Sequence, residues 1–205
     1  MKKEIRNFDF EVRAEQNDEN GKYLSGQPIV YNERTDLGWY DEIIADGALD
    51  GADLRDVRFL INHNTDMIPL ARSRNNNANS TMQMEVVPGV GMSIRVNLDT
   101  ENNAVAKSLY SAVERGDITG MSFMFAVDKE NWEDIDTEHP TRTILSFKKV
   151  FEVSAVTFPA YEATSITARG LSDALDSARA SLESARREAR EIERKKQKIR
   201  ILAEA

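Results

Sequence analysis

The apolar positions follow two different rhythms along the chain. From Phe8 to about Arg169, short apolar segments alternate with polar residues or run almost unbroken, and turn residues separate them. Such a pattern is typical of short strands. From Leu171 to Ala205 the sequence contains no Gly or Pro, and apolar residues recur at helical spacing. The pattern predicts a strand-rich body over residues 1–169 and a charged helical tail over residues 170–205.

Within the body, the clearest feature is a hairpin formed by residues 82–87 and 92–98, joined by Pro-Gly-Val-Gly. Further strands are expected at 8–13, 27–32, 56–61, 121–127, 143–148 and 150–158. Residues 43–49 read as a strand end that leads into a helical turn, and 75–80 and 128–142 as surface loops.

One segment of the body changes to helical spacing. Residues 101–115 carry apolar side chains every three or four positions, with Asp99 or Thr100 as the expected N-cap and Gly116 after the end. Many strands with one or two interposed helices predict an α+β fold. We expect a small, mostly antiparallel β-barrel that is closed or nearly closed, with surrounding helices.

The tail shows a heptad pattern. Leu171, Ala178, Ala185, Ile192 and Ile199 are spaced by seven, and Leu175, Leu182 and Ala189 lie four positions after the first three. Small residues and Lys196 interrupt this stripe. A single exposed helix and a coiled coil, or another packed partner helix, both agree with the pattern.

Charge and composition exclude several classes of protein. The net charge is −8, and the tail from Leu171 has nine basic against seven acidic residues, which leaves −10 on residues 1–170. An acidic body argues against a general nucleic-acid binder. The chain has no cysteine, no apolar run of the roughly 20 residues that cross a bilayer, and no signal sequence, so we expect a cytosolic protein without membrane contact.

Three residues combine into a possible catalytic group. His63 closes the run 57–64, Ser122 lies inside the apolar run 120–125, and Glu152 stands between Phe151 and Val153. A histidine, a serine and an acid are the components of an activated nucleophile. Each also has a structural interpretation: a hydrogen-bonded strand end for His63, a small residue in a tight place for Ser122, and a paired buried carboxylate for Glu152.

Other chemistries have no support in the sequence. His63 and His139 are far apart, and the chain contains no His-x-x-x-His motif and no acidic loop with calcium-site spacing. It also lacks the glycine-rich loops that bind nucleotides. We therefore expect neither a metal nor a cofactor.

The body resembles the tailed-phage prohead proteases, serine endopeptidases that mature the procapsid. The ordered segments that carry the resemblance are 26–31 (Gly-Gln-Pro-Ile-Val-Tyr), 42–49 (Glu-Ile-Ile-Ala-Asp-Gly-Ala-Leu), 57–64, 68–72 (Ile-Pro-Leu-Ala-Arg), 120–125 (Gly-Met-Ser-Phe-Met-Phe) and 151–161. In the fourth segment Ala71 stands where the family usually has glycine.

The resemblance implies a fold similar to the herpesvirus assemblins, with His63 as general base and Ser122 as nucleophile. It leaves the third role open. We assign that role to Glu152, with Asp66 as the runner-up, because His139 lies in a polar loop. The backbone near Leu70-Ala71-Arg72 is where we expect oxyanion donors.

The same resemblance implies the partners and the place of action. The substrates would be the major capsid protein precursor or its scaffold segment, inside the assembling procapsid in the host cytoplasm. The helical pattern of residues 171–205 suggests self-association or docking on capsid or scaffold, and the resemblance suggests removal by self-cleavage. The alternative function is a non-catalytic assembly or scaffolding protein that acts through this helix.

Overall fold

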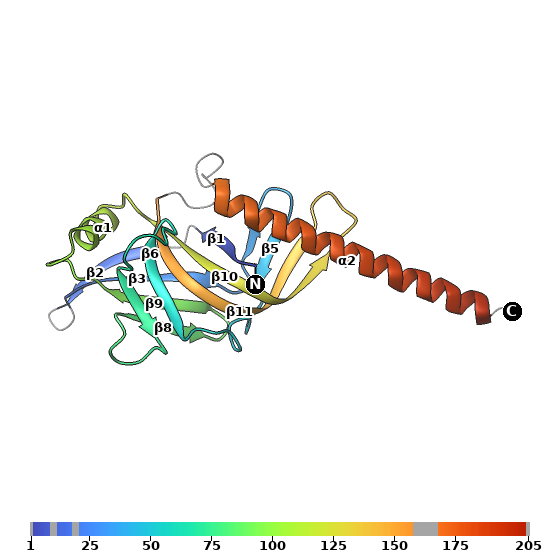
Figure 1. Cartoon of the computed structure of the whole chain (residues 1–205), viewed down its shortest axis with the longest axis horizontal. Coiled ribbons are helices and arrows are strands. Elements are labelled where there is room, and N and C mark those ends of the chain that lie inside the picture. The colour runs from blue at the N-terminus through green and yellow to red at the C-terminus, as the bar shows by residue number, and fades with distance from the viewer. Residues whose placement is uncertain (1, 9–11, 18–20, 158–167, 204–205) are drawn as a thin grey trace.

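The structure, a computed structural model, describes residues 2–8, 12–17, 21–157 and 168–203, which form an α+β fold of two sheets and two helices (Figure 1). In chain order the elements are β1 (Glu4–Phe8), β2 (Val12–Asn17), β3 (Gly21–Val30), β4 (Arg34–Asp36), β5 (Asp41–Ile44), β6 (Asp56–Ile61), β7 (Ala71–Arg74), β8 (Met82–Val87), β9 (Gly91–Asn97), α1 (Ala104–Glu114), β10 (Gly120–Glu133), β11 (Thr141–Val156) and α2 (Ala168–Ala203). Among these residues, no helix has the length and apolar character that a bilayer crossing requires.

The larger sheet forks along its longest strand. Strand β11 pairs with β10 on one side along its whole length. On its other side, its first residues pair with β5 in parallel and its last residues pair with β6. Strand β1 flanks β10, β4 flanks β5 and β7 flanks β6. A second sheet of four strands has the order β2-β3-β9-β8.

The predicted closed barrel is wrong for the described residues. Their larger sheet ends at β1, β4 and β7, and none of these three strands pairs with another to close a ring. Closure requires each edge strand to find a hydrogen-bonded neighbour. Here β5 and β6 share one side of β11, so the strands spread apart from it.

Apolar side chains from both sheets and from α1 form one core. Phe123 and Phe125 of β10 stack with ring centroids 4.9 Å apart, and Phe147 of β11 meets both rings edge-on. Strand β9 alternates between buried and half-buried positions, which explains the clear period-two signal in its sequence. The hairpin of β8 and β9 and the strand expected at 56–61 are both confirmed.

Some expected boundaries are wrong. Helix α1 begins later than expected because Asn103 caps it, its side chain accepting hydrogen bonds from the N–H groups of Val105 and Ala106. The strand expected at 8–13 belongs in part to β1 and in part to β2, which lie in different sheets, and residues 9–11 lie outside the described residues.

The largest correction concerns the segment 128–142, expected as a loop. Strand β10 continues to Glu133 and β11 begins at Thr141, so only 134–140 connect them. The polar residues here remain in strands because Trp132 and Arg142, which face each other in register, are both buried. The two strands expected at 143–148 and 150–158 form a single strand, β11, up to Val156.

Helix α2 lies along one side of the body and extends well past it (Figure 1). Its Ala178 and Leu182 are buried in a small apolar cluster with Tyr40 and Trp132. Trp132 donates its indole N–H to the Ser181 hydroxyl at 3.0 Å. The part of the heptad stripe between residues 175 and 185 therefore packs on the protein's own body. The division into a protease domain and a separate tail stays a prediction.

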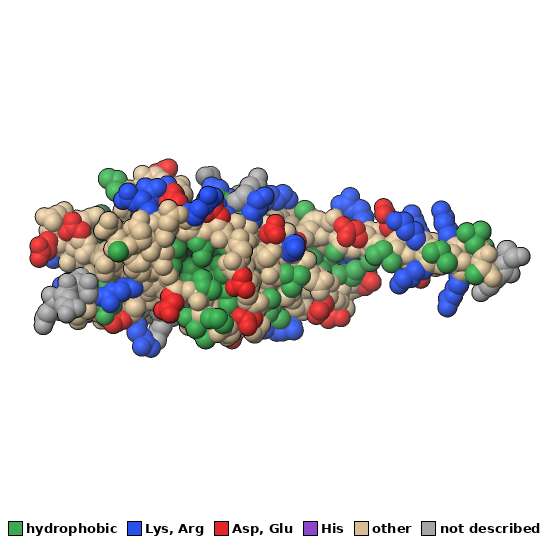
Figure 2. Space-filling model, turned by 90° about the horizontal axis from the view of Figure 1, so that it is seen from below, with side chains coloured by type: hydrophobic (Ala, Val, Ile, Leu, Met, Phe, Trp, Pro, Cys, Tyr) green, Lys and Arg blue, Asp and Glu red, His purple; other side chains and the backbone are tan. Residues whose placement is uncertain are grey.

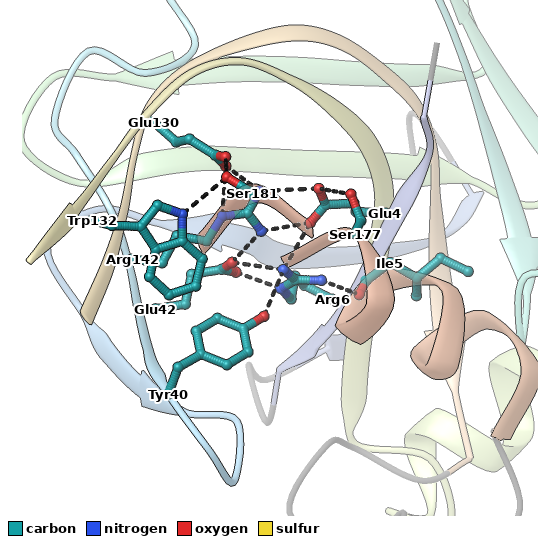
Figure 3. Close-up of polar contacts among 10 residues, drawn as sticks. All are labelled: Glu4, Ile5, Arg6, Tyr40, Glu42, Glu130, Trp132, Arg142, Ser177 and Ser181. Carbon is teal, nitrogen blue, oxygen red and sulfur yellow. Dashed lines mark hydrogen bonds and ion pairs between the residues drawn. The ribbon is translucent and has the colours of Figure 1, made fainter. Parts of the chain in front are cut away.

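A buried network of charges links this helix to the sheet (Figure 3). Arg6 of β1 bonds to Glu4 and Glu42, and Arg142 of β11 bonds to the same two carboxylates and to Glu130. Ser177 and Ser181 of α2 donate to Glu4 and Glu130. Burial raises the pKa of Tyr40, which accepts a hydrogen bond from Arg6, to about 12.

The network pairs positive with negative side chains, and this pairing offsets the cost of removing the charges from water. Burial by itself would raise the pKa of Glu4, but its hydrogen bond to Arg142 and the positive charges of Arg6 and Arg142 lower the pKa overall. Burial disfavours the charged forms of both arginines, yet the neighbouring glutamates raise their pKa values. Charges that are taken out of water remain ionised only when they are paired in this way.

Candidate active site

His63 lies in a turn that folds back over the end of strand β6. Asn62 and His63 both adopt left-handed backbone conformations, with φ of 50° and 56°. The Asn62 amide exchanges two hydrogen bonds with Thr157, through the Thr157 hydroxyl at 3.0 Å and its backbone N–H at 2.9 Å. Asparagine tolerates left-handed conformations better than most residues. The turn is thus fastened to the end of β11.

The imidazole of His63 is hydrogen-bonded to the carboxylate of Glu152. The His63 Nδ1 lies 2.5 Å from Glu152 Oε1, and only 7% of the His63 side chain and 3% of the Glu152 side chain are exposed. A carboxylate accepts a hydrogen bond, so Nδ1 carries the proton in this pair. In the neutral imidazole this leaves Nε2 as the nitrogen that is able to take up a proton.

Ser154 completes the surroundings of this pair. Its hydroxyl donates to Glu152 Oε2 at 2.5 Å and accepts the backbone N–H of His63 at 3.1 Å. Our sequence reasoning missed this residue. The signal was present, because two-residue alternation along a strand puts Ser154 on the same face as Glu152.

Ser122 lies on the neighbouring strand, β10, directly opposite Ser154 in antiparallel register. Residues opposite each other share a face of the sheet, and their Cβ atoms are roughly 4.5–5.5 Å apart. Ser122 is fully buried, and its hydroxyl donates to the backbone carbonyl of Arg6 in β1 at 2.7 Å. The sheet therefore places Ser122, Ser154 and Glu152 on one face of two adjacent strands, and His63 reaches Glu152 from the turn after β6.

The two other candidates for the third role lie elsewhere. Asp66 is exposed in the turn after His63, where its backbone N–H bonds to Asn64. His139 lies in the connection between β10 and β11, at the opposite end of the hairpin from Ser122. His139 there meets Asp41 at 3.0 Å, and with Asp36 these residues form the one group of metal-ligand spacing among the described residues.

The expected oxyanion donors are not supported. Leu70 donates its N–H to the Phe59 carbonyl, and Arg72 donates its N–H to the Thr81 hydroxyl. Strand β7, which begins at Ala71, is separated from β10 by β6 and β11. Three strand spacings amount to roughly 14 Å, too far for a hydrogen bond to a carbonyl at Ser122.

Comparison with known proteins adds an independent observation. The family model of the caudovirus prohead serine proteases matches residues 8–177, which include His63, Ser122 and Glu152. No curated protein and no solved structure matches the chain. The match covers well over half of the 205 residues. The chain therefore belongs to the caudovirus prohead serine protease family, and it is a serine protease.

Proposed function

We propose that this protein is an endopeptidase that cleaves the capsid precursor or its scaffold segment during procapsid maturation, with Ser122 as nucleophile, His63 as general base and Glu152 as the acid that orients it. The observation that carries the proposal is the buried His63–Glu152 pair at 2.5 Å, one strand away from Ser122. Family membership supplies the class of substrate.

The reaction follows from the proton positions. Nε2 of His63 takes the proton of the Ser122 hydroxyl as the oxygen attacks the scissile carbonyl, and Glu152 stabilises the imidazolium that forms. The imidazolium then gives this proton to the leaving amine, and an acyl-enzyme remains. In the second half, His63 takes a proton from water as the water oxygen attacks the ester carbon. The imidazolium then gives this proton to the Ser122 oxygen as the acyl–oxygen bond breaks, which releases the acid product and restores the enzyme. Before attack, the hydroxyl must turn away from the Arg6 carbonyl.

We expect Ser122→Ala and His63→Ala each to abolish cleavage of the cognate capsid precursor, because each removes a group that forms or breaks a bond. Cleavage is followed by gel electrophoresis and mass spectrometry. Ser73→Ala is the matched control, because Ser73 is equally buried in a strand and lies on β7, away from Ser122.

Two further measurements keep this test decisive. A thermal melt checks that each variant folds, and a fluorophosphonate reagent should label wild type and Ser73→Ala but not Ser122→Ala. A folded Ser122→Ala protein that still cleaves the precursor would refute the assignment of the nucleophile.

The far part of α2 favours a second function, in assembly. Ile192, Ile199 and Leu202 are each more than half exposed, and residues 186–203 contain eight basic against three acidic residues. Basic side chains surround this protruding part of the helix in Figure 2. A basic helix with exposed apolar residues fits an acidic amphipathic partner on the capsid or scaffold protein, and self-association is the competing possibility.

Removal of residues 188–205 tests this second function without disturbing the docked part of the helix. We expect the shortened protein to cleave free precursor normally but to co-assemble less well into procapsids, measured by sedimentation with Ser122→Ala as background. Equal co-assembly with and without the segment contradicts the proposal. A Ser122-dependent loss of C-terminal mass in the full chain would instead indicate self-cleavage.

A further inference from the structure

We propose that Ser154 is a positioning residue of the catalytic group, because its hydroxyl fixes Glu152 and the backbone of His63 at the same time. This inference rests on the proposed function of Ser122, His63 and Glu152. It adds a fourth residue, to which neither the family match nor the sequence pattern gave a role.

The hydroxyl of Ser154 makes two contacts of opposite kind. It donates its hydrogen to Glu152 Oε2 at 2.5 Å, a length typical of a bond to an ionised carboxylate. It accepts the backbone N–H of His63 at 3.1 Å through a lone pair. Ser154 is fully buried, so water does not compete for either bond.

These contacts close a ring of interactions around the imidazole. Glu152 holds Nδ1 of His63 with one carboxylate oxygen, and Ser154 binds the other oxygen. Ser154 in turn holds the backbone N–H of the same histidine. The side chain and the main chain of His63 are therefore tied to the same two residues of β11, which limits rotation of the ring.

The turn takes the backbone N–H of His63 out of the strand ladder, and the Ser154 hydroxyl accepts it. His63 has left the ladder of β6, which ends at Ile61, and its φ of 56° turns its N–H away from the strand pattern. A buried N–H without an acceptor costs roughly 1–3 kcal/mol. Ser154 supplies that acceptor, and alanine or valine at this position has no side-chain oxygen to offer.

The location of Ser154 makes its effect direct. It stands opposite Ser122, between the strand that carries the nucleophile and the turn that carries the base. A shift of about 1 Å in the relative position of two reacting groups lowers the rate by roughly 100-fold.

The test compares Ser154→Ala with Ser154→Thr, which retains the hydroxyl and suits a strand. We expect Ser154→Ala to lower kcat by about 10- to 100-fold with little change in KM. Fluorophosphonate labelling of Ser122 should slow in the same variant, because the reagent needs the same alignment of Ser122 and His63 but no peptide. Ser154→Thr should restore both quantities substantially, and Ser73→Ala should change neither.

Folding is controlled with a near-isosteric variant. Ser154→Cys retains the size of the residue but replaces a strong donor with a weak one, so a folded Ser154→Cys protein should show the same loss of kcat and the same slowed labelling. Wild-type kcat together with a wild-type labelling rate in folded Ser154→Ala or Ser154→Cys overturns the inference.

Failure of this inference differs from failure of the proposed function. If Ser122→Ala still cleaves the precursor, the catalytic assignment is wrong whatever Ser154 does. If Ser122→Ala is inactive while folded Ser154 variants behave as wild type, only the positioning role of Ser154 is wrong. Fluorophosphonate labelling of Ser122, slowed in Ser154→Ala and restored in Ser154→Thr, gives a readout that is independent of the peptide substrate.

Discussion

At the scale of single residues, Glu152 is the most informative position in the candidate site. A carboxylate in an apolar strand is costly to bury unless it has partners, and the structure gives it two, His63 and Ser154. The expectation that Glu152 needs a partner came from its neighbours Phe151 and Val153. Strand alternation could have indicated Ser154, but identifying His63 as a partner required the fold, because it is 89 residues away.

Glu152→Gln separates orientation from charge. The Gln carbonyl is still able to accept the Nδ1 proton, but a neutral amide stabilises the imidazolium less well. We expect kcat to fall by about 10³- to 10⁴-fold, less than in Ser122→Ala, since loss of the acid usually costs less than loss of the nucleophile. Precursor cleavage measures this, with a thermal melt alongside. Activity close to wild type in a folded variant would move the third role to another residue.

At the scale of elements, strand β1 joins the candidate site to helix α2. Its Arg6 carbonyl meets the Ser122 hydroxyl, while the Arg6 side chain enters the buried charge network. Glu4 on the same strand accepts a hydrogen bond from Ser177 of α2 (Figure 3). Nothing in the short sequence Glu-Ile-Arg-Asn-Phe indicates this role, because its partners lie in four other elements.

The lowered pKa of Glu4 predicts an acid-sensitive contribution to stability. The pKa of this carboxyl group is near 4.5 in the unfolded chain and lower in the folded protein. The ionised group therefore stabilises the fold at pH values above 4.5, and this contribution disappears as pH falls through the folded pKa. We expect Glu4→Gln to cost at least about 1.5 kcal/mol at pH 7. The difference from wild type should shrink below about pH 4.5.

Urea unfolding between pH 3 and pH 7 measures this difference. Comparison with the variant cancels the contributions of other carboxylates, such as Asp41 and Asp56, whose pKa values are also lowered. A gap between Glu4→Gln and wild type that stays constant across this range would mean that the charge on Glu4 adds nothing to stability.

At the scale of the whole molecule, the sequence predicted those elements whose apolar residues follow a clear local pattern. The hairpin of β8 and β9 and the buried strand β6 have strong period-two or continuous apolar signals, and both are present. Segment 128–142 was wrongly predicted as a loop, because its acidic residues and its arginine are of types that are usually exposed to solvent. Arg142 is instead buried against carboxylates from β1, β5 and β10, and only the assembled fold brings these together.

The candidate site likewise combines residues that the local sequence indicates with an arrangement that only the assembled fold provides. Residue type and apolar context singled out His63, Ser122 and Glu152, and their placement around β11 depends on the pairing of β6 and β10 with its opposite sides. Residues 70–72 were expected to supply oxyanion donors because they follow His63 closely in the sequence. Strand β7, which begins there, is separated from the strand of Ser122 by β6 and β11. The open sheet was equally hidden, since strand number alone does not reveal that β5 and β6 share one side of β11.

The bond from Ser122 to the Arg6 carbonyl has a kinetic consequence. In the proposed mechanism, His63 competes with the Arg6 carbonyl for the Ser122 hydroxyl hydrogen, and only molecules in which this hydrogen points to His63 react. A preference of about 1 kcal/mol for the carbonyl, an ordinary value for one hydrogen bond, makes such molecules about one in six. Because the carbonyl belongs to the main chain, replacing the side chain at position 6 does not remove the competitor. Under the proposed mechanism, this competition lowers the rate of acylation about sixfold, because the hydroxyl rotates much faster than the bond is broken.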